Sequence, residues 1–337
     1  MLRTPANPGV VLSAQVEKPM ALTLSDAEEM VTAAKLNGRF LMEGMWTRFF
    51  PAVRHARQLI ADGAIGSVVH VQADFGFVCD DPLTSRMFDK SLGGGGLLDI
   101  GCYTIDAAAV AFHGRSPQSV TASGRLGVTG VVRPRLHKKP GVASLTPWPA
   151  RQDLSGHVIV EYEGGGSAGL MYSLCAQTEE ATTIWGTGGS IKLQSPAHCP
   201  SQLSLQQWGP DDAERAGSTE TITQHFPLPT VNTGEHYNYP NSQGLRYQIE
   251  EVEKCLAEGR IESEEYTHAE MLTNAATMQE ARQQIGLLFE SEVEQQPQQA
   301  QPLVEGLELW SSSERLAELA GANLVTEKEA GAKSASL

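Results

Sequence analysis

The first 66 residues alternate between short apolar runs and segments with helical spacing. Residues 9–16 form an apolar run that predicts a strand, and Thr23 or Ser25 then caps a predicted helix. A second apolar run at residues 39–45 and a second helix over residues 51–63 repeat this order. Strand, helix, strand, helix is typical of a parallel sheet with crossover connections. We therefore expect an α/β region at the start of the chain.

After Gly66 the pattern changes to longer alternating segments, of the kind that form an antiparallel sheet. Residues 67–77 alternate like a strand with one wet face, and residues 93–114 predict a helix that begins with glycines. Further strands are predicted at residues 119–126, 155–165, 167–177, 180–194 and 201–208. Amphipathic helices are predicted over residues 244–259 and 268–289. The expected fold class is α/β followed by α+β, with a large, mostly antiparallel, open-faced sheet and flanking helices.

The net charge narrows the classes of partner. The 337 residues carry 25 Lys and Arg against 40 Asp and Glu, which gives a net charge of −15. This balance argues against nucleic acid or an anionic membrane as the main partner, and it leaves a small-molecule ligand open. No apolar run approaches the roughly 20 residues of a membrane-spanning helix. The five cysteines are widely spaced without a C-x-x-C pair, so we expect reduced thiols in a cytoplasmic protein.

Lys18 is the first candidate for chemistry. It precedes Pro19, which favours extended geometry, so it should lie where a strand leaves the sheet. In open α/β sheets, ligands bind beyond the carboxyl ends of the strands. A lysine there can lower the pKa of a nearby hydroxyl or polarise an oxygen atom. The alternative is an ordinary solvated lysine in a turn.

A polar stripe marks the predicted glycine-led helix. Asp99, Tyr103 and Asp106 are spaced i, i+4, i+7 and should share one face of an otherwise apolar helix. A tyrosine can act as a general acid or base if a cation lowers its pKa, and a carboxylate one turn away can orient a substrate. The glycines at residues 93–96 would let a ligand approach the backbone and its free N–H groups. Alternatively, Tyr103 is a core residue and Asp99 a buried cap.

Aromatic residues follow the second predicted strand. Trp46, Phe49 and Phe50, together with Arg48, could form an apolar pocket with one polar handle, or could simply belong to the core. The nine histidines show no spacing typical of metal ligands, so we predict no metal site.

Taken in order, four segments resemble the Gfo/Idh/MocA family of nicotinamide-dependent oxidoreductases. The resemblance covers roughly residues 16–289 and is greatest to the family's branch of dihydrodiol dehydrogenases and D-xylose dehydrogenases. The segments are EKPMALT (17–23), residues 42–77, GGGGLLDIGCYTID (93–106) and residues 241–263.

The resemblance implies hydride transfer from a substrate CH–OH group to a nicotinamide cofactor, NADP or possibly NAD. Lys18 matches the lysine of the family's E-K-P motif, so Glu17, Lys18 and Pro19 would border the nicotinamide. Asp99 and Tyr103 match a D-x-G-x-[HY] motif, in which Tyr103 would transfer the proton and Asp99 would hold the substrate hydroxyl. Lys18 would tune Tyr103.

The same resemblance implies the pocket and the assembly. Trp46, Arg48, Phe77 and Arg125 are pocket candidates because they lie near the matched segments. The substrate would be a small diol or a sugar, and the open sheet would form a homodimer.

The family also has a buried strand and a G-x-G-x-x-G turn before its E-K-P motif, whereas only 17 residues precede Lys18 here. We find no strand–glycine turn–helix unit elsewhere. We therefore expect residues 1–66 to be the C-terminal part of a Rossmann-like domain whose front units are missing. Residues 67–289 would form the substrate and dimerisation domain, and residues 290–337 a polar, Gln-rich linker and flexible tail. An alternative function is a non-catalytic dimerising or interaction protein derived from such an enzyme.

Overall fold

The α/β start of the chain is a parallel strand pair in the computed structural model. Strands β3 (Ala14–Val16) and β4 (Leu41–Glu43) pair in parallel, and helix α1 (Leu24–Leu36) connects them. The side chain of Thr23 caps α1 by accepting a hydrogen bond of 3.2 Å from the backbone N–H of Asp26. Helix α2 (Pro51–Ala61) begins at its proline, as predicted. The first predicted strand is shorter than expected, because residues 7–11 instead form β2 (Asn7–Val11), paired with β1 (Arg3–Thr4).

An eight-stranded sheet forms the larger part of the structure. Its order is β12–β11–β10–β9–β5–β8–β7–β6, and each neighbouring pair is antiparallel except β5 with β8. The strands are β5 (Val68–Gly76), β6 (Pro117–Leu126), β7 (Asp153–Tyr162), β8 (Ser167–Ser173), β9 (Thr182–Gly186), β10 (Gly189–Leu193), β11 (Gln202–Gln207) and β12 (Thr221–His225). The fold-class prediction is therefore confirmed, and β12 is the strand that the sequence pattern missed.

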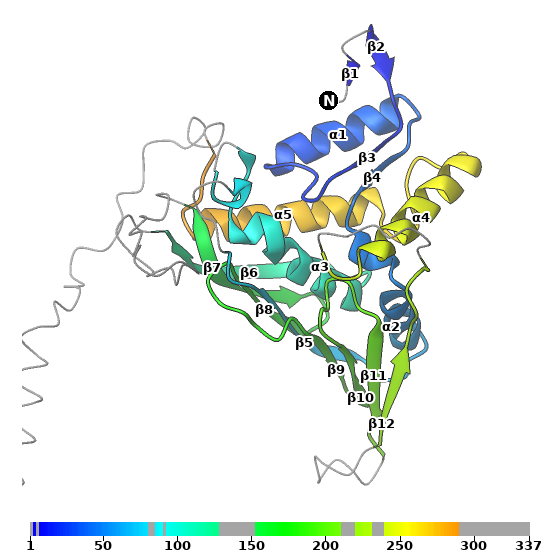
Figure 1. Cartoon of the computed structure of the whole chain (residues 1–337), viewed down its shortest axis with the longest axis vertical. Coiled ribbons are helices and arrows are strands. Elements are labelled where there is room, and N and C mark those ends of the chain that lie inside the picture. The colour runs from blue at the N-terminus through cyan, green and yellow to red at the C-terminus, as the bar shows by residue number, and fades with distance from the viewer. Residues whose placement is uncertain are drawn as a thin grey trace, which may run out of the picture. The chain divides into compact units, whose positions relative to one another are not determined.

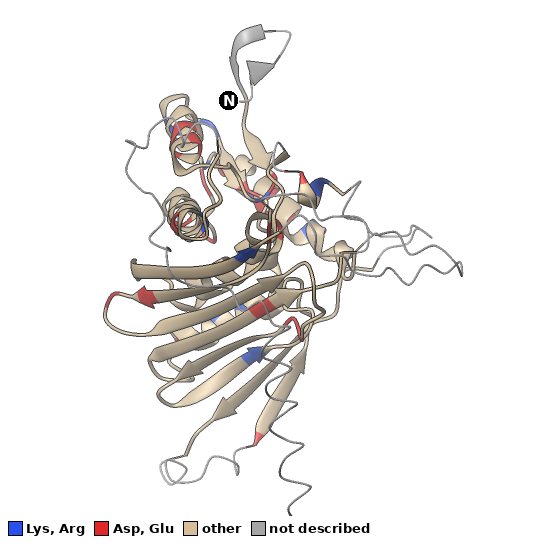
Figure 2. Ribbon diagram, turned by 90° about the vertical axis from the view of Figure 1, so that its left-hand side faces the viewer, with Lys and Arg blue, Asp and Glu red and all other residues tan. Residues whose placement is uncertain are grey.

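Helices cover one face of this sheet. Helices α2, α3 (Cys102–Ala111) and α5 (His268–Gln284) pack against it, and α5 also packs along α1 (Figure 1). Helix α4 (Leu245–Ala257) packs on η1 (Trp46–Phe49), a short 3₁₀ helix. On β7, Val158 and Val160 are buried while Ile159 between them is 50% exposed, so the strand has one core face and one open face. In Figure 2 few residues along these strands carry the colours of charged residues.

The glycine run does not begin the predicted helix in regular form. Residues 97–101 form a π-helical turn (Leu97–Gly101) before α3 starts at Cys102. Gly95 has a φ of +127°, and a Cβ atom there would lie 2.1 Å from Asp153 Oδ1. The backbone N–H of Leu97 donates to the other carboxylate oxygen of Asp153 at 2.6 Å. The expectation that these glycines admit a ligand is therefore wrong, because β7 occupies the space.

The described residues are 3–4, 7–79, 85–89, 92–127, 152–209, 220–230 and 239–289, and residues 1–289 belong to one unit. The predicted tail, residues 290–337, lies outside them. Within the described ranges, no helix has the length and apolar character needed to cross a membrane. Gly164–Gly169 matches the letters G-x-G-x-x-G, but it turns β7 into β8 and does not join a strand to a helix.

Candidate active site

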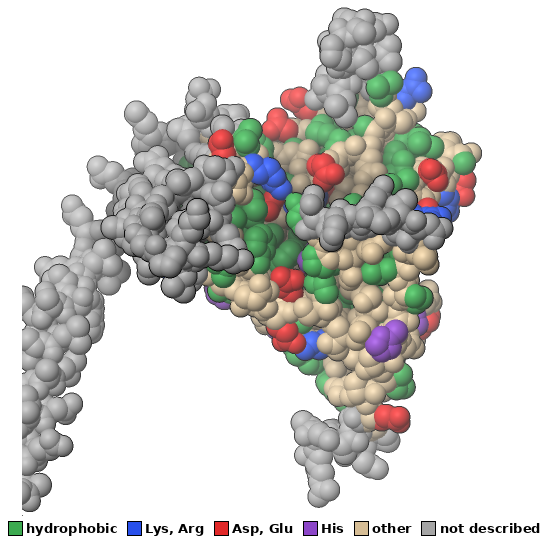
Figure 3. All heavy atoms as spheres, viewed as in Figure 1, with side chains coloured by type: hydrophobic (Ala, Val, Ile, Leu, Met, Phe, Trp, Pro, Cys, Tyr) green, Lys and Arg blue, Asp and Glu red, His purple; other side chains and the backbone are tan. Residues whose placement is uncertain are grey.

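A cavity of about 480 Å³ lies where the parallel strands end. Its lining comes from the segment after β3, from η1, from β5, from the π turn with α3, and from α4. Several aromatic side chains line the wall, and charged groups from several elements converge on it. On the face shown in Figure 3, hydrophobic side chains gather in a hollow with acidic and basic side chains at its edge. Such an apolar pocket with a few convergent polar groups is the usual form of a small-molecule site.

Lys18 lies in this cavity directly after β3. Its ammonium donates a hydrogen bond to the carbonyl oxygen of Asp99, and Nζ lies 3.8 Å from Asp99 Oδ1 and 4.7 Å above the ring centre of Tyr103. Burial alone would lower the pKa of Lys18. The neighbouring Cys102, Tyr103 and Asp99 together raise it by more than burial lowers it, so the net shift of the pKa is upward. Lys18 is therefore a stable cation beside the phenol.

Tyr103 shares the cavity wall with Trp46. The Trp46 indole N–H donates to the Tyr103 hydroxyl at 3.1 Å. Burial raises the pKa of Tyr103 above its usual value, and the charge of Lys18 and the Trp46 hydrogen bond offset part of that rise. The phenol is thus protonated near neutral pH and has a proton to donate.

The structure brings Asp99 and Tyr103 together but separates Asp106 from them. Asp99 is paired with two cations, since Arg86 Nη2 lies 2.8 Å and Lys18 Nζ 3.8 Å from its Oδ1 atom. Asp106 is buried away from the cavity, where it accepts hydrogen bonds from Arg48 at 2.6 Å and from Asn274 at 2.8 Å. The predicted common face is wrong for Asp106, because the π turn changes the helical phase after Asp99.

The structure brings only some of the other predicted residues to the cavity. Glu17, Trp46 and Phe77 line it. Arg48 does not: its guanidinium is fully buried against Asp106, Glu270 and the ring of Tyr266. A buried guanidinium requires such partners, which holds it in the core.

Two more predicted residues differ in position. Arg125 is exposed on β6 and is not part of the lining, because its strand lies at the far edge of the sheet. Pro19 follows Lys18 out of the cavity and does not line it.

Sequence reasoning missed Glu43, at the end of β4. Its carboxylate is buried and accepts hydrogen bonds from the backbone N–H of Met20 at 3.0 Å and from the Tyr266 hydroxyl at 2.6 Å. Burial raises its pKa to about 7, although these hydrogen bonds oppose the shift. Glu43 thus anchors the segment that carries Lys18. It lies inside a matched segment, but nothing in that segment distinguishes it from an exposed acid.

Three further charged residues of the cavity were also missed. Arg86 pairs with Asp99, while Glu180 and His198 come from loops beside β9 and β11. Their positions depend on how distant strands pair, and no local spacing signals them.

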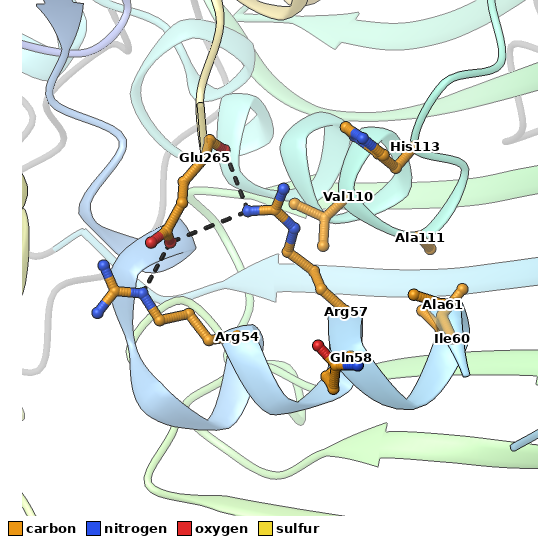
Figure 4. Close-up of a pocket in the computed structure, with 9 residues that line it drawn as sticks. All are labelled: Arg54, Arg57, Gln58, Ile60, Ala61, Val110, Ala111, His113 and Glu265. Atoms are coloured by element: carbon orange, nitrogen blue, oxygen red, sulfur yellow. Dashed lines mark hydrogen bonds and ion pairs between the residues drawn. The ribbon is translucent and has the colours of Figure 1, made fainter. Parts of the chain in front are cut away.

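A second cavity, of about 500 Å³, lies between α2 and α3 (Figure 4). Arg54 and Arg57 reach from α2 towards Glu265, and Arg54 Nε is 2.7 Å from Glu265 Oε2. Arg57 donates to the carbonyl oxygen of Glu265 at 3.1 Å. Val110 and His113 border the other side. The arginines of this cavity are thus already paired with Glu265.

Together, a protonated tyrosine, an adjacent lysine and an aspartate in an aromatic cavity define an enzyme that can exchange a proton with a substrate oxygen. Comparisons with known proteins agree. The family model described as GFO/IDH/MocA C-terminal domain matches residues 53–192. Trans-1,2-dihydrobenzene-1,2-diol dehydrogenase of Danio rerio is 33% identical over 273 residues, which cover 81% of this chain and 70% of that protein. The Xenopus laevis protein of the same name is 34% identical over 275 residues, 81% and 71% of the two chains. The chain belongs to the Gfo/Idh/MocA family of oxidoreductases.

Solved structures share the fold. An oxidoreductase domain protein from Kribbella flavida has a TM-score of 0.64 at 24% identity and covers 81% of this chain and 72% of that one. A levoglucosan dehydrogenase solved with NADH and levoglucosan has a TM-score of 0.62 at 20% identity, over 81% and 71%. The family resemblance predicted from the motifs is therefore confirmed.

Proposed function

We propose that the protein is an NADP-dependent oxidoreductase that oxidises a CH–OH group of a small diol or sugar, with Tyr103 as its acid–base residue. The observation that carries this proposal is the convergence of Lys18, Asp99 and Tyr103 on one aromatic cavity. The name shared by the relatives supports a cyclic diol as substrate. D-Xylose is the second substrate that the family branch suggests.

The cavity residues divide the chemistry among them. In the reductive direction Tyr103, protonated at rest, donates its phenolic proton to the carbonyl oxygen. The oxidative direction requires the phenolate, which would first have to form against the effect of burial and would then accept the hydroxyl proton. Lys18, 4.7 Å from the ring centre, stabilises that phenolate electrostatically. The Asp99 carboxylate, held by Arg86, accepts a hydrogen bond from the substrate hydroxyl and orients it. The aromatic side chains give the proton-transfer site an apolar wall.

The residues present fit the reactive end of a nicotinamide cofactor. Glu17 and Lys18 line the cavity at the carboxyl end of a parallel strand, where such ligands bind in α/β sheets. When bound, the nicotinamide supplies the hydride acceptor. The described part of the chain offers no glycine turn between a strand and a helix that could bind the diphosphate. The described residues therefore fit the nicotinamide end of the cofactor and not its diphosphate.

A cofactor titration tests the proposal. NADPH and NADH are added to the purified full chain while tryptophan fluorescence is followed, since Trp46 lines the cavity. We expect saturable quenching at micromolar NADPH, weaker binding of NADH, and turnover of a trans-dihydrodiol or D-xylose. Lys18→Met should weaken NADPH binding about tenfold, because it removes one charge-assisted contact.

Lys35→Met is the matched control, since Lys35 is exposed on α1; it should leave binding unchanged. If folded wild-type protein binds neither nucleotide, the cofactor proposal is overturned and the non-catalytic interaction protein becomes the better reading.

We also infer that the open sheet face forms a homodimer. Strand register puts His70, Trp185 and Ile159 on the face opposite the helices, and the His70 and Trp185 rings stack with centroids 5.7 Å apart. The large apolar side chains Ile159, Met171 and Trp185 lie on this face among mainly uncharged polar ones, and such a mixed surface with few charges suits a second copy of the same face. Light scattering should give twice the chain mass for wild type and a monomer for Ile159→Lys. Leu36→Lys, at an 81% exposed position on α1, should remain dimeric; monomeric wild type contradicts the inference.

A further inference from the structure

A histidine and a glutamate share the catalytic cavity with Tyr103. His198 lies in the loop between β10 and β11, and Glu180 lies in the loop before β9. Both line the cavity of about 480 Å³, and their side chains are 12% and 14% exposed. His198 Nδ1 lies 3.6 Å from Glu180 Oε2. The roles assigned to Lys18, Asp99 and Tyr103 use neither residue.

The fold holds both residues in place. Glu180 has a φ of +56°, a conformation that side-chain-bearing residues rarely adopt, and it is retained because its neighbours fix its backbone. Its N–H donates to Asp74 at 2.8 Å, and its carbonyl accepts from the N–H of Ala197 at 2.8 Å. The His198 ring stacks on Phe75 with centroids 4.4 Å apart and an angle of 12°. The Thr47 hydroxyl donates to the carbonyl oxygen of His198.

The pair has hydrogen-bonding capacity that no described residue uses. Nδ1 of His198 is buried, and among the described residues it has no hydrogen-bond partner, since 3.6 Å is too long for one. The other ring nitrogen, Nε2, lies 3.3 Å from the Cys199 sulfur. Glu180 receives one long contact of 3.4 Å from the Gln177 amide. A buried nitrogen without a partner is costly, and a ligand hydroxyl between Nδ1 and the carboxylate would satisfy both groups.

The rings of Tyr103, His198 and Phe75 contact one another and form one continuous wall of the cavity. The centroids of the Tyr103 and His198 rings are 5.6 Å apart, and the ring of Phe75, 5.6 Å from that of Tyr103, lies beside both. A carbocycle or pyranose can rest its C–H face on such an aromatic wall while hydroxyls at its edge reach polar groups on either side.

We propose that His198 and Glu180 bind a second hydroxyl of the substrate while the reacting hydroxyl lies at Tyr103. This inference rests on the proposed function and deepens it, because it makes the pair the specificity determinant for polyhydroxylated rings over mono-alcohols. A site built to hydrogen-bond a hydroxyl discriminates strongly against an analogue that lacks it, since its polar groups are then left unpaired.

Binding of two matched ligands tests the proposal without any turnover. Trans-1,2-cyclohexanediol and cyclohexanol are titrated into the full chain by calorimetry, with and without NADPH. Wild type should prefer the diol by about tenfold, the effect of one well-formed hydrogen bond. His198→Phe keeps the stack on Phe75 but removes the nitrogens, and Glu180→Gln removes only the charge. Each should lower diol affinity towards that of cyclohexanol and leave cyclohexanol within about twofold of wild type.

The neighbouring acid provides the control. Glu179 is paired with Lys192 at 2.5 Å, is 63% exposed and does not line the cavity. Glu179→Gln should keep the wild-type preference. Wild-type protein without a preference for the diol overturns the proposal, and so do variants that weaken both ligands equally, because that result indicates a purely structural role.

The outcomes also separate this proposal from the proposed function. Diol selectivity that depends on His198, in a protein that binds no nucleotide, supports the pair and contradicts the oxidoreductase. If the protein turns over a diol as a dehydrogenase, and His198→Phe and Glu180→Gln leave its preference for the diol unchanged, the oxidoreductase is supported and the role of the pair is contradicted.

Discussion

The cavity lined by Lys18 and the cavity lined by Arg54 have nearly equal volumes, about 480 and 500 Å³, and quite different chemistry. In the first, Lys18 and Asp99 are 13% and 11% exposed and face a tyrosine whose proton is available. In the second, Arg54 is 37% and His113 is 56% exposed, and each already contacts a glutamate, at 2.7 and 3.2 Å. Volume therefore does not identify a functional site. Buried polar groups that converge with spare hydrogen-bonding capacity do, because their desolvation must be offset by a ligand or a reaction.

The short helix η1 contributes to two different environments. Its residue Trp46 lines the first cavity, while Arg48 belongs to the buried network of Asp106 and Glu270. Glu270 also contacts His113 of the second cavity. The network of Arg48, Asp106 and Glu270 thus consists of charges paired with one another. It should carry stability, whereas the first cavity should carry activity.

The largest expected effect is on catalysis in the first cavity. Tyr103→Phe removes the proton donor and keeps the ring beneath Lys18, so turnover should fall by about 10² to 10⁴. Tyr247→Phe is the matched control, because its hydroxyl bonds only the Pro227 carbonyl at 3.3 Å and lies outside the cavity. Steady-state kinetics with the best substrate measures both variants. A Tyr103→Phe enzyme within tenfold of wild type would exclude this tyrosine as the acid–base residue.

The next largest effect is on stability, in the network of Arg48, Asp106 and Glu270. Arg48→Met leaves the buried carboxylates of Asp106 and Glu270 without their cation, which should cost about 3–5 kcal/mol in the free energy of unfolding. Arg48 normally holds the pKa of Glu270 at about 2 against the opposing effect of burial. Urea unfolding measures the loss. A change below about 1 kcal/mol would mean that Arg48 contributes packing only.

The features that the sequence predicted depend on local spacing, whereas those that it missed depend on contacts between residues far apart in the chain. Spacing of 3.6 and 2.0 residues is local, so α1, α2, α4, α5 and most strands were predictable. Lys18, Asp99 and Tyr103 were found because their motifs occur in a recognisable order. Asp106 was predicted on the wrong face because one π turn changes the helical phase after Asp99. Arg48 was predicted in the pocket because its pairing with Asp106 and Glu270 depends on tertiary contacts that local spacing does not reveal. Glu180 and His198 meet only through the pairing of distant strands.

A smaller, pH-dependent effect is expected behind the first cavity. The pKa of Glu43 is about 7, raised by burial from 4.5, so the folded state holds a proton that the unfolded state releases between these values. The protonated Glu43 therefore stabilises the folded state by about 3 kcal/mol below pH 4.5, and this contribution to the free energy of unfolding is lost as the pH rises to 7. Unfolding of Glu43→Gln, which cannot titrate, should lack this part of the pH dependence. Equal pH slopes for the variant and wild type would show that other groups cause the slope.

The smallest effect is expected in the second cavity, and it completes the comparison. Glu265→Gln removes the partner of Arg54, but these side chains are 25% and 37% exposed, so water can replace the lost contact. The backbone carbonyl of Glu265, which accepts from Arg48 and Arg57, remains unchanged. We expect a loss of at most about 1 kcal/mol by urea unfolding, and turnover within twofold of wild type. A marked loss of turnover with intact stability would mean that the cavity lined by Arg54 and Arg57 also takes part in function. The pairing of its charged groups would then not distinguish it from the cavity that contains Lys18.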